Sequence, residues 1–185
     1  MRFTRKFYIS DTHFNHENII RYSNRPFVSV DEMNESMIAQ WNFAVSDHDI
    51  VYHLGDFACG SAESAAEIFS RLRGRKRLIP GNHDMRRDGQ PHKSILDLPW
   101  DEPPVQTKEV RDSGHRVFLS HYAHRTWPGS GNGSYHFYGH SHGNLPHYGR
   151  SRDVGVDLPD VHFRPRTFSE LTAALPSVQS AATAA

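Results

Sequence analysis

The sequence predicts an α/β fold, and two observations carry that prediction. Short apolar runs that suit strands alternate with helical patterns through the first half of the chain. Such alternation is typical of parallel strands joined by right-handed crossovers. Closely spaced strand-like runs then fill the second half, where Asp112-Ser113-Gly114 has the composition of a hairpin turn. We therefore expect the second half to be more antiparallel than the first.

The expected strands are apolar runs bounded by turn residues. Between the two halves, Met85–Pro104 is rich in Pro, Arg and Asp and is expected to be mostly irregular. The strands are expected at about Lys6–Ser10, Ile50–Leu54, Arg77–Ile79, Val105–Val110, Arg116–Leu119, Tyr135–Tyr138 and Val154–Val156.

The first long helix is marked by its N-terminal signals. Ser29 and Glu32 have the spacing of a capping box, and Val28 and Met33 have the spacing of a hydrophobic staple. An apolar face then repeats at helical spacing. Its members are Val30, Met33, Met37, Trp41 and Ala44. This face predicts packing against the core and carries no chemistry.

Two further helices are expected. One spans about residues 61–73 and stops at Gly74, since glycine favours the left-handed backbone that ends helices. Its apolar face comprises Ala62, Ala65, Ala66, Phe69 and Leu72. The other is short: Thr167 and Glu170 form a second capping box, and Pro176 ends the helix.

Composition bounds the class of protein. The chain has 185 residues, so we expect one domain over residues 1–176 and a flexible tail over 177–185. Twenty-one basic residues balance twenty-one acidic ones, so bulk charge does not indicate binding to nucleic acid. No apolar run approaches the roughly 20 residues of a membrane helix, and no signal peptide is expected. Cys59 is the only cysteine, which fits a reducing, cytoplasmic setting and a small packed side chain.

Polar residues follow five of the strand-like runs. In open parallel sheets, functional sites lie at the carboxyl ends of the strands. Carboxylate, amide and imidazole groups suit divalent metals, and seven candidates exceed the needs of one ion if water also binds. Any one motif alone would indicate a polar loop, whereas five in order indicate two ions sharing a bridging carboxylate. The motifs are Asp11-x-His13, Gly55-Asp56, Gly81-Asn82-His83-Asp84, Ser120-His121 and Gly139-His140-Ser141-His142.

This order of motifs, from Asp11 to His142, resembles the calcineurin-like metallophosphoesterase superfamily. The segment Ser10–Phe27 is similar to a small stand-alone bacterial and phage branch. The resemblance implies a four-layer α-β-β-α sandwich of two facing mixed sheets flanked by helices. It also implies one metal held by Asp11, His13, Asp56 and His142, and a second held by Asp56, Asn82, His121 and His140.

The same resemblance implies the chemistry. A hydroxide shared by two cations would attack phosphorus in line with the leaving oxygen. His83 would protonate the leaving group or stabilise the charged transition state. Asp84 would orient His83 through its other ring nitrogen, unless it serves as a helix cap or turn residue.

Four further residues are candidates for contact with substrate. His16 could contact phosphate, or it is a solvated loop histidine. Arg25 could anchor phosphate through its fork of donors, or it forms a surface ion pair. His124 and Trp127 could form a substrate wall, with Trp127 stacking on a ring, or Trp127 anchors its loop on the core. The remaining histidines are assigned no role.

The function expected is hydrolysis of small phosphodiesters by a dinuclear metal-dependent phosphodiesterase. A phosphomonoesterase or nuclease of the same superfamily is the alternative, and a non-enzymatic scaffold is a third. All ligand positions are filled, which argues against the scaffold. Mn is the favoured metal because the resemblance implies that it supports activity, while Fe, Zn, Co and Ni also suit these ligands. A small phosphate ester is the expected partner, and the oligomeric state is left open.

Overall fold

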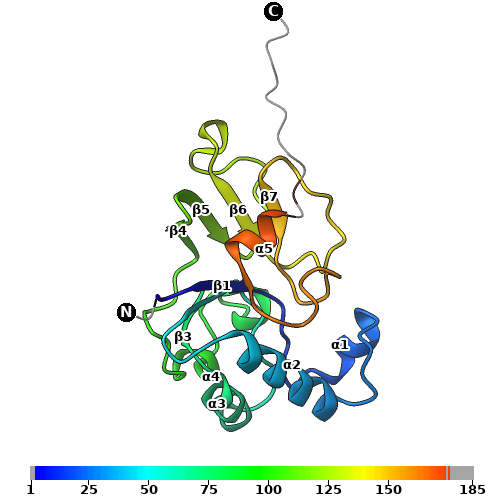
Figure 1. Ribbon diagram of the computed structural model, residues 1–185. Helices are drawn as coiled ribbons and strands as arrows, with labels where there is room; N and C mark the ends of the chain where they lie inside the picture. The colour runs from blue at the N-terminus through cyan, green and yellow to red at the C-terminus, as the bar shows by residue number, and fades with distance from the viewer. Residues whose placement is uncertain (1–2, 174, 176–185) are drawn as a thin grey trace, which may run out of the picture.

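Two four-stranded sheets face each other in the computed structural model, which describes residues 3–173 and 175 (Figure 1). The strand orders are β3-β2-β1-β8 and β4-β5-β6-β7. Each sheet has two parallel pairs and one antiparallel pair. The predicted pair of facing mixed sheets flanked by helices is therefore confirmed.

The first sheet is built from the first half of the chain and one late strand. Its parallel strands are β1 (Lys6–Ile9), β2 (Ile50–His53) and β3 (Arg75–Leu78), and β8 (Arg166–Thr167) pairs antiparallel with β1. Helices α2 (Val30–Ala44) and α3 (Ala62–Arg71) cover its outer face (Figure 1). Trp41 and Phe69 from these helices join Phe7 and Val51 in one buried cluster. The predicted crossover helices thus pack against the strands that they connect.

The second sheet corrects the expectation of a more antiparallel second half. Its strands are β4 (Thr107–Asp112), β5 (His115–Ser120), β6 (Tyr135–Tyr138) and β7 (Ser151–Asp153). Only β4 and β5 are antiparallel, and the predicted hairpin joins them. The strands β5, β6 and β7 run parallel, because long connections return the chain before each new strand.

A second buried cluster fills the space between the sheets. Tyr8 and Tyr52 from the first sheet meet Leu119 and Phe137 from the second. Helix α5 (Phe168–Ala173) adds Phe168 and Leu171 to this cluster. The two sheets therefore form one packed unit, and the carboxyl ends of β1, β2, β3, β5 and β6 come together along one edge.

Local signals were right at helix starts and less reliable elsewhere. The Ser29 side chain accepts a hydrogen bond from the Glu32 N–H, as a cap does, but Val28 is 95% exposed and forms no staple. Helix α3 buries Ile68 instead of the predicted Ala62 and Ala66, which are exposed. Helices α1 (Glu17–Tyr22) and α4 (Lys93–Leu96) and strand β8 were not predicted, and β7 precedes the strand expected at Val154–Val156.

The predicted end of the last helix at Pro176 and the tail over 177–185 lie outside the described residues. The capping box before α5 is present, since Glu170 and Thr167 exchange hydrogen bonds with each other's backbone N–H. Among the described helices, none is both long and apolar enough to cross a membrane.

Candidate metal centre

Polar side chains at the strand ends of both sheets meet in one cluster. The structure brings together all seven residues predicted as metal ligands: Asp11 and His13 after β1, Asp56 after β2, Asn82 after β3, His121 after β5, and His140 and His142 after β6. The ligand atoms of Asp11, His13 and His142 lie within 4.8 Å of one another, as do those of Asp56, His121 and His140. Each group contains three of the four residues in one of the two ligand sets that the family resemblance implies.

Asp56 lies between the two groups. One carboxylate oxygen is 3.5 Å from His13 Nε2, and the other is 3.7 Å from His121 Nε2. The side chain is 2% exposed, and burial raises its pKa although the backbone N–H of His83 and nearby imidazoles oppose the shift. Burial and the nearby Asp153 likewise raise the pKa of Asp11 well above its usual value. Buried carboxylates of this kind favour a cation beside them.

The imidazoles are held so that one nitrogen of each faces the cluster. His121 Nδ1 donates to the Leu54 carbonyl at 2.7 Å, which leaves Nε2 turned toward Asn82 Oδ1 at 3.1 Å. Asn82 Oδ1 also lies 2.9 Å from His140 Nδ1. Burial lowers the pKa of His121 to about 4, so the ring is neutral and can donate a lone pair. Such outer contacts orient metal-binding histidines in proteins.

His13 provides the most direct test of whether these residues suit a metal. Its side chain is 1% exposed, and neither ring nitrogen has a hydrogen-bond partner among the described residues. Burial and the nearby Arg25 lower its pKa, so the ring is neutral. A buried imidazole without partners is costly, and a metal ion would satisfy one of its nitrogens. The donor set of carboxylate, amide and imidazole therefore fits divalent metal ions.

The backbone at the cluster is unusual. Five of the predicted ligands have positive φ: Asp11, His13, Asp56, His140 and His142, with values between 47° and 67°. The left-handed region costs a non-glycine residue about 1–2 kcal/mol. Strain of this kind is found at functional sites, where the surrounding structure holds it in place.

Two glycines allow the strand ends to approach one another. A side chain at Gly139 would clash with Ser10 Oγ and approach Asp11 Oδ2. A side chain at Gly81 would clash with a carboxylate oxygen of Asp56. The absence of a side chain at these two positions therefore lets the backbone lie close to the candidate ligands.

The predicted role of Asp84 is wrong. Its carboxylate is fully buried and accepts hydrogen bonds from the backbone N–H groups of Asp56 at 2.7 Å, Phe57 at 3.0 Å and Gly81 at 2.9 Å. Its oxygens are thus occupied by backbone and do not orient the His83 ring. Burial and the nearby Asp56 raise its pKa to about 6. Asp84 instead holds the β2 and β3 loops together, which is closer to the alternative role of a turn residue.

His83 lies at the rim of the cluster. Its ring is exposed and lies 4.9 Å from the His13 ring, measured between centroids. Its backbone N–H donates to the Asp56 carboxylate at 2.8 Å. A ring nitrogen of His83 lies within 4.8 Å of ligand atoms of His13 and Asp56, and the exposed side chain can also reach a substrate beside the cluster.

Arg25 does not lie where a phosphate anchor would lie. Its side chain is buried, and the guanidinium donates to both oxygens of Asp157, at 2.7 and 3.0 Å, and to the carbonyls of Asp11 and Thr12. With these donors occupied, neither the predicted phosphate contact nor the surface ion pair is found. Arg25 instead braces the backbone that carries two predicted ligands.

Asp157 and Asp153 are the acidic residues that the sequence analysis missed. Asp157 Oδ2 lies 2.6 Å from His142 Nδ1. Burial would raise the pKa of Asp157, but hydrogen bonds from His142 and Arg25 lower it. The hydrogen bond to Asp157 and the nearby carboxyl of Asp11 raise the pKa of His142 against the effect of its burial, while Arg25 opposes the rise. A correctly placed β7 would have revealed Asp153 as one more polar strand end.

His124 and Trp127 lie outside the cluster. His124 Nε2 is 3.1 Å from Ser120 Oγ, and the ring packs edge-on against Phe118. Trp127 is 8% exposed, and its indole N–H donates to the Ser134 carbonyl at 3.3 Å. The predicted substrate wall is therefore corrected: Trp127 anchors its loop on the outer face of the second sheet.

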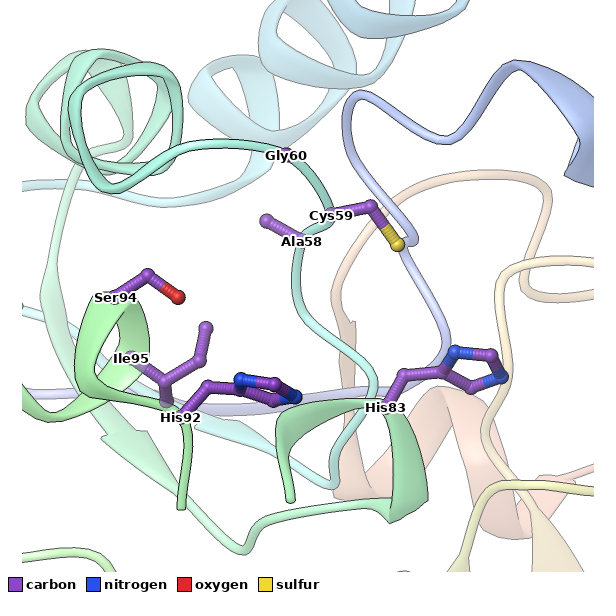
Figure 2. Close-up of a pocket in the computed structure, with 7 residues that line it drawn as sticks. All are labelled: Ala58, Cys59, Gly60, His83, His92, Ser94 and Ile95. Carbon is purple, nitrogen blue, oxygen red and sulfur yellow. The ribbon is translucent and has the colours of Figure 1, made fainter. Parts of the chain in front are cut away.

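Two cavities border the cluster at different residues. One, of about 260 Å³, is lined by His83 together with Cys59, His92 and Ser94 (Figure 2). The other, of about 480 Å³, is lined by His142 together with Leu145 and Pro146. Groups bound at the cluster can therefore extend into space on either side.

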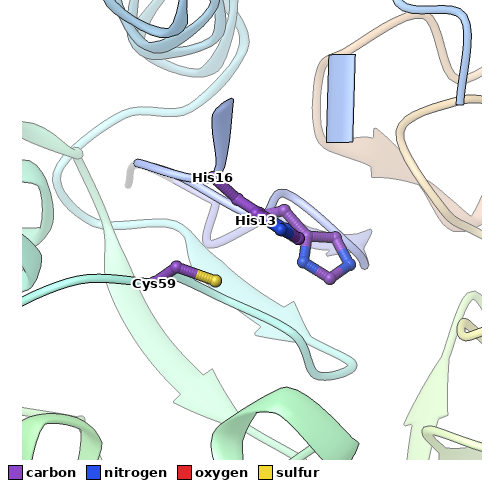
Figure 3. A group of neighbouring side chains, drawn as sticks. All are labelled: His13, His16 and Cys59. Carbon is purple, nitrogen blue, oxygen red and sulfur yellow. The ribbon is translucent and has the colours of Figure 1, made fainter. Parts of the chain in front are cut away.

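His16 and Cys59 flank His13. Their ligand atoms lie within 4.8 Å of one another and of His13, and the Cys59 thiol points toward the two rings (Figure 3). Burial, Asp56 and Asp84 raise the pKa of Cys59 to about 11, so it is a thiol at neutral pH. His16 is half-buried at the edge of the site, where its predicted contact with substrate stays a prediction.

Comparison with known proteins agrees with this geometry. The sequence model of the family described as calcineurin-like phosphoesterase matches residues 5–166. The chain belongs to this family. The family uses divalent metals, and the cluster supplies candidate ligands for them.

Two curated proteins match part of the chain in sequence, and one solved structure shares its fold. An uncharacterized protein of Methanocaldococcus jannaschii is 54% identical over 83 residues, which are 43% of this chain and 47% of that protein. The gene 66 protein of Mycobacterium phage L5 is 35% identical over 95 residues, 48% of this chain and 44% of that protein. The chain thus spans about half the length of these curated relatives. A protein of unknown function from Aquifex aeolicus shares the fold, with a TM-score of 0.69 and 24% identity over 94% of this chain and 100% of that one.

Proposed function

We propose that the protein is a dinuclear metal-dependent phosphodiesterase that acts on small phosphodiesters. The observation that carries this proposal is the cluster of seven candidate ligands at the strand ends, five of them on left-handed backbone. Asp56, between the two groups, is proposed to bridge both metals because each of its oxygens faces a different imidazole. With Asp56 shared, the seven residues of the cluster would supply all the protein ligands of two metals, and water or substrate would complete the coordination.

The chain's own residues would divide the work as follows. Asp11, His13, Asp56 and His142 would hold one cation, and Asp56, Asn82, His121 and His140 the other. Bound divalent cations supply an activated water at neutral pH and positive charge against the phosphoryl oxygens.

His83 would donate a proton to the leaving oxygen, which its exposure at the rim supports. Asp84, Arg25 and Asp157 would keep the loops and His142 in position. These residues therefore act on the reaction only through the backbone and ligands that they hold.

The two cavities support a diester rather than a monoester. A phosphodiester carries two organic groups, and the cluster is bordered by one cavity at His83 and another at His142. A monoester would leave one of them without a function. The balanced charge of the chain supports small substrates over a long nucleic-acid track.

We further propose Mn as the metal and the cytoplasm as the setting. Oxygen and imidazole ligands suit Mn, and Fe, Zn, Co and Ni are compatible with the same set. The single cysteine supports a reducing compartment.

The test is hydrolysis of bis-p-nitrophenyl phosphate and p-nitrophenyl phosphate by metal-stripped protein re-supplied with Mn. We expect rapid cleavage of the diester and slow cleavage of the monoester, both abolished by chelation. Preference for the monoester would replace the proposal with a phosphatase. Two bound metals without turnover of either ester would contradict the enzymatic proposal and favour a scaffold.

A further inference from the structure

The cavity beside His83 has a defined chemical character. It lies between the loop after β2, which contributes Cys59, and helix α4 with the residue before it, which contribute His92, Ser94 and Ile95 (Figure 2). The His92 ring is turned toward His83 in this view. The cavity thus begins at the rim of the metal cluster and extends away from it along α4.

Its walls combine polar and apolar groups, with imidazoles in place of carboxylate, lysine or arginine side chains. Ile95 is 1% exposed and forms an apolar wall, while His92 and Ser94 offer an imidazole and a hydroxyl. Neither of these two side chains has a hydrogen-bond partner among the residues that the structure describes. The seven lining residues include no Asp, Glu, Lys or Arg. Such a cavity offers hydrogen bonds from its imidazoles and hydroxyl, but neither a carboxylate for an ammonium nor a lysine or arginine for a phosphate, so it suits a neutral hydroxylated group.

Its volume limits the size of that group. At about 260 Å³, the cavity is smaller than the ~300–1,000 Å³ typical of sites for drug-sized ligands. The cavity beside His142 is larger, at about 480 Å³, and its lining combines Leu145, Pro146 and Leu158 with the carboxyl groups of Asp157 and Asp160. The two cavities therefore differ in size, and of the two only the larger is lined by acidic residues.

We propose that the cavity beside His83 binds the alcohol that leaves phosphorus, and that this alcohol is compact, neutral and hydroxylated, as glycerol or a single sugar is. This inference rests on the proposed function, because it takes His83 as the proton donor. A proton donor must lie next to the oxygen of the bond that breaks, and His83 lines this cavity. The second organic group then stays on phosphorus and lies toward the larger cavity at His142.

The step balances as a hydrolysis. A water oxygen forms a new bond to phosphorus, and the bond from phosphorus to the alcohol oxygen breaks with its electron pair on that oxygen. The proton of the His83 imidazolium passes to the alcohol oxygen, the attacking water loses one proton to solvent, and His83 regains one from solvent. The products are the free alcohol and a phosphate monoester of the retained group.

Benzyl glyceryl phosphate tests this orientation with the Mn-supplied full chain. Both of its alcohols are alkyl alcohols, so the products report the orientation that the protein imposes. We expect glycerol and benzyl phosphate to exceed benzyl alcohol and glyceryl phosphate by at least about tenfold, the effect of one or two hydrogen bonds. Ser94→Trp, which fills the cavity, is expected to lower glycerol release at least about tenfold, whereas Ser70→Trp on an exposed face is the matched control. Predominant release of benzyl alcohol by the unmodified protein would overturn the assignment.

Cys59 gives a second readout that does not depend on turnover. It is the only cysteine and lines the cavity, so alkylation by iodoacetamide at pH 9 produces a single adduct that mass spectrometry follows. The phosphonate analogue of benzyl glyceryl phosphate, in which a methylene replaces the glyceryl ester oxygen, should slow the alkylation of Cys59. The analogue that carries a propyl group without hydroxyls in place of the glyceryl group should slow it less. Protection of Cys59 without hydrolysis would support the cavity and contradict the proposed function. Hydrolysis without protection would support the function and overturn the cavity.

Discussion

The two sheets share one plan but contribute different chemistry to the metal centre. Each has three parallel strands and one antiparallel edge strand. The ends of the first sheet supply every oxygen ligand in the proposed set, namely Asp11, Asp56 and Asn82. The ends of the second sheet supply only imidazoles, namely His121, His140 and His142.

The difference extends to burial. Asp11 and Asp56 are 0% and 2% exposed, and burial raises the pKa of each. On the second sheet, His121 is 1% exposed, whereas His140 is exposed and His142 is half-buried. Buried carboxylates favour a cation most strongly, so the first sheet should dominate metal affinity. The second sheet should adjust that affinity and complete the coordination.

Asp56→Ala tests the dominant contribution of the first sheet. The variant loses the only proposed ligand shared by both metals, so we expect loss of both ions. We expect kcat/KM to fall by at least about 10³-fold, because bound cations are worth several kcal/mol of barrier and each 1.36 kcal/mol is tenfold. Metal content by elemental analysis and diester hydrolysis measure the two effects. Asp101→Ala, at a surface ion pair with Arg77, is the control, and two metals retained by Asp56→Ala would refute the bridge.

His83→Gln separates proton donation from metal binding on the same sheet. His83 is outside the seven proposed ligands, so both metals should remain. General acid catalysis typically contributes ~10²–10⁴-fold, so kcat should fall about 10²-fold or more for diesters of alkyl alcohols. The loss should be much smaller for p-nitrophenyl esters, whose leaving group needs little protonation. Equal losses for the two kinds of ester would argue against the proton-donor role.

Asp157→Asn tests the supporting role of the second sheet. Asp157 holds His142 Nδ1 at 2.6 Å and is itself held by Arg25. Removal of such an outer partner typically lowers metal affinity about 10- to 100-fold, less than the loss of a ligand. Calorimetric titration of the metal-stripped variant with Mn should show one site with weakened Mn affinity and one site with unchanged affinity. Weakening of both sites to the same extent would indicate a general structural effect instead.

The clustering of the candidate metal ligands could be predicted because these residues follow strands in sequence. The apolar runs ending in Asp11, Asp56 and His121 are visible without a structure, and parallel topology brings strand ends together. Direction of pairing in the second half was not visible, because a hairpin has local turn residues while the β5–β6 and β6–β7 pairings depend on distant segments. The alternation of strands and helices therefore predicted the first sheet better than the second.

The supporting residues could not be predicted because their partners are far apart along the chain. Arg25 and Asp157 are 132 residues apart, and Asp84 accepts from the backbone of Asp56, 28 residues earlier. A spacing rule reports only on neighbours within a turn or a strand. The adjacent pair His83-Asp84 suggested a mutual contact, whereas the fold turns the two side chains to different partners.

The smallest expected effect concerns a buried histidine on the second sheet, away from the metal centre. His136 is 0% exposed; its Nδ1 donates to the Phe118 carbonyl at 3.1 Å and its Nε2 accepts from the His124 N–H at 3.0 Å. The contact with the His124 N–H requires the neutral ring, because a protonated Nε2 cannot accept a hydrogen bond, and burial lowers the pKa of His136 to about 4. Between pH 6.5 and 4 the unfolded chain therefore binds more protons at this histidine than the folded chain does. The contribution of the buried neutral ring to stability is fully present above pH 6.5 and is lost as the pH falls toward 4.

His136→Gln keeps a donor and an acceptor but removes the titration. Between pH 7 and pH 5, the free energy of unfolding of the metal-free protein should fall by about 2 kcal/mol less in this variant than in the unmodified chain. Urea unfolding at the two pH values measures the difference, and His48→Gln, an exposed histidine, should show none. The equivalent change at His53 of the first sheet would be harder to interpret, because its Nε2 contacts Thr12 Oγ1, between two proposed ligands. If the free energy of unfolding depends on pH in His136→Gln as it does in the unmodified chain, the prediction is wrong. The acid sensitivity of the fold would then reside in the first sheet and its candidate metal ligands.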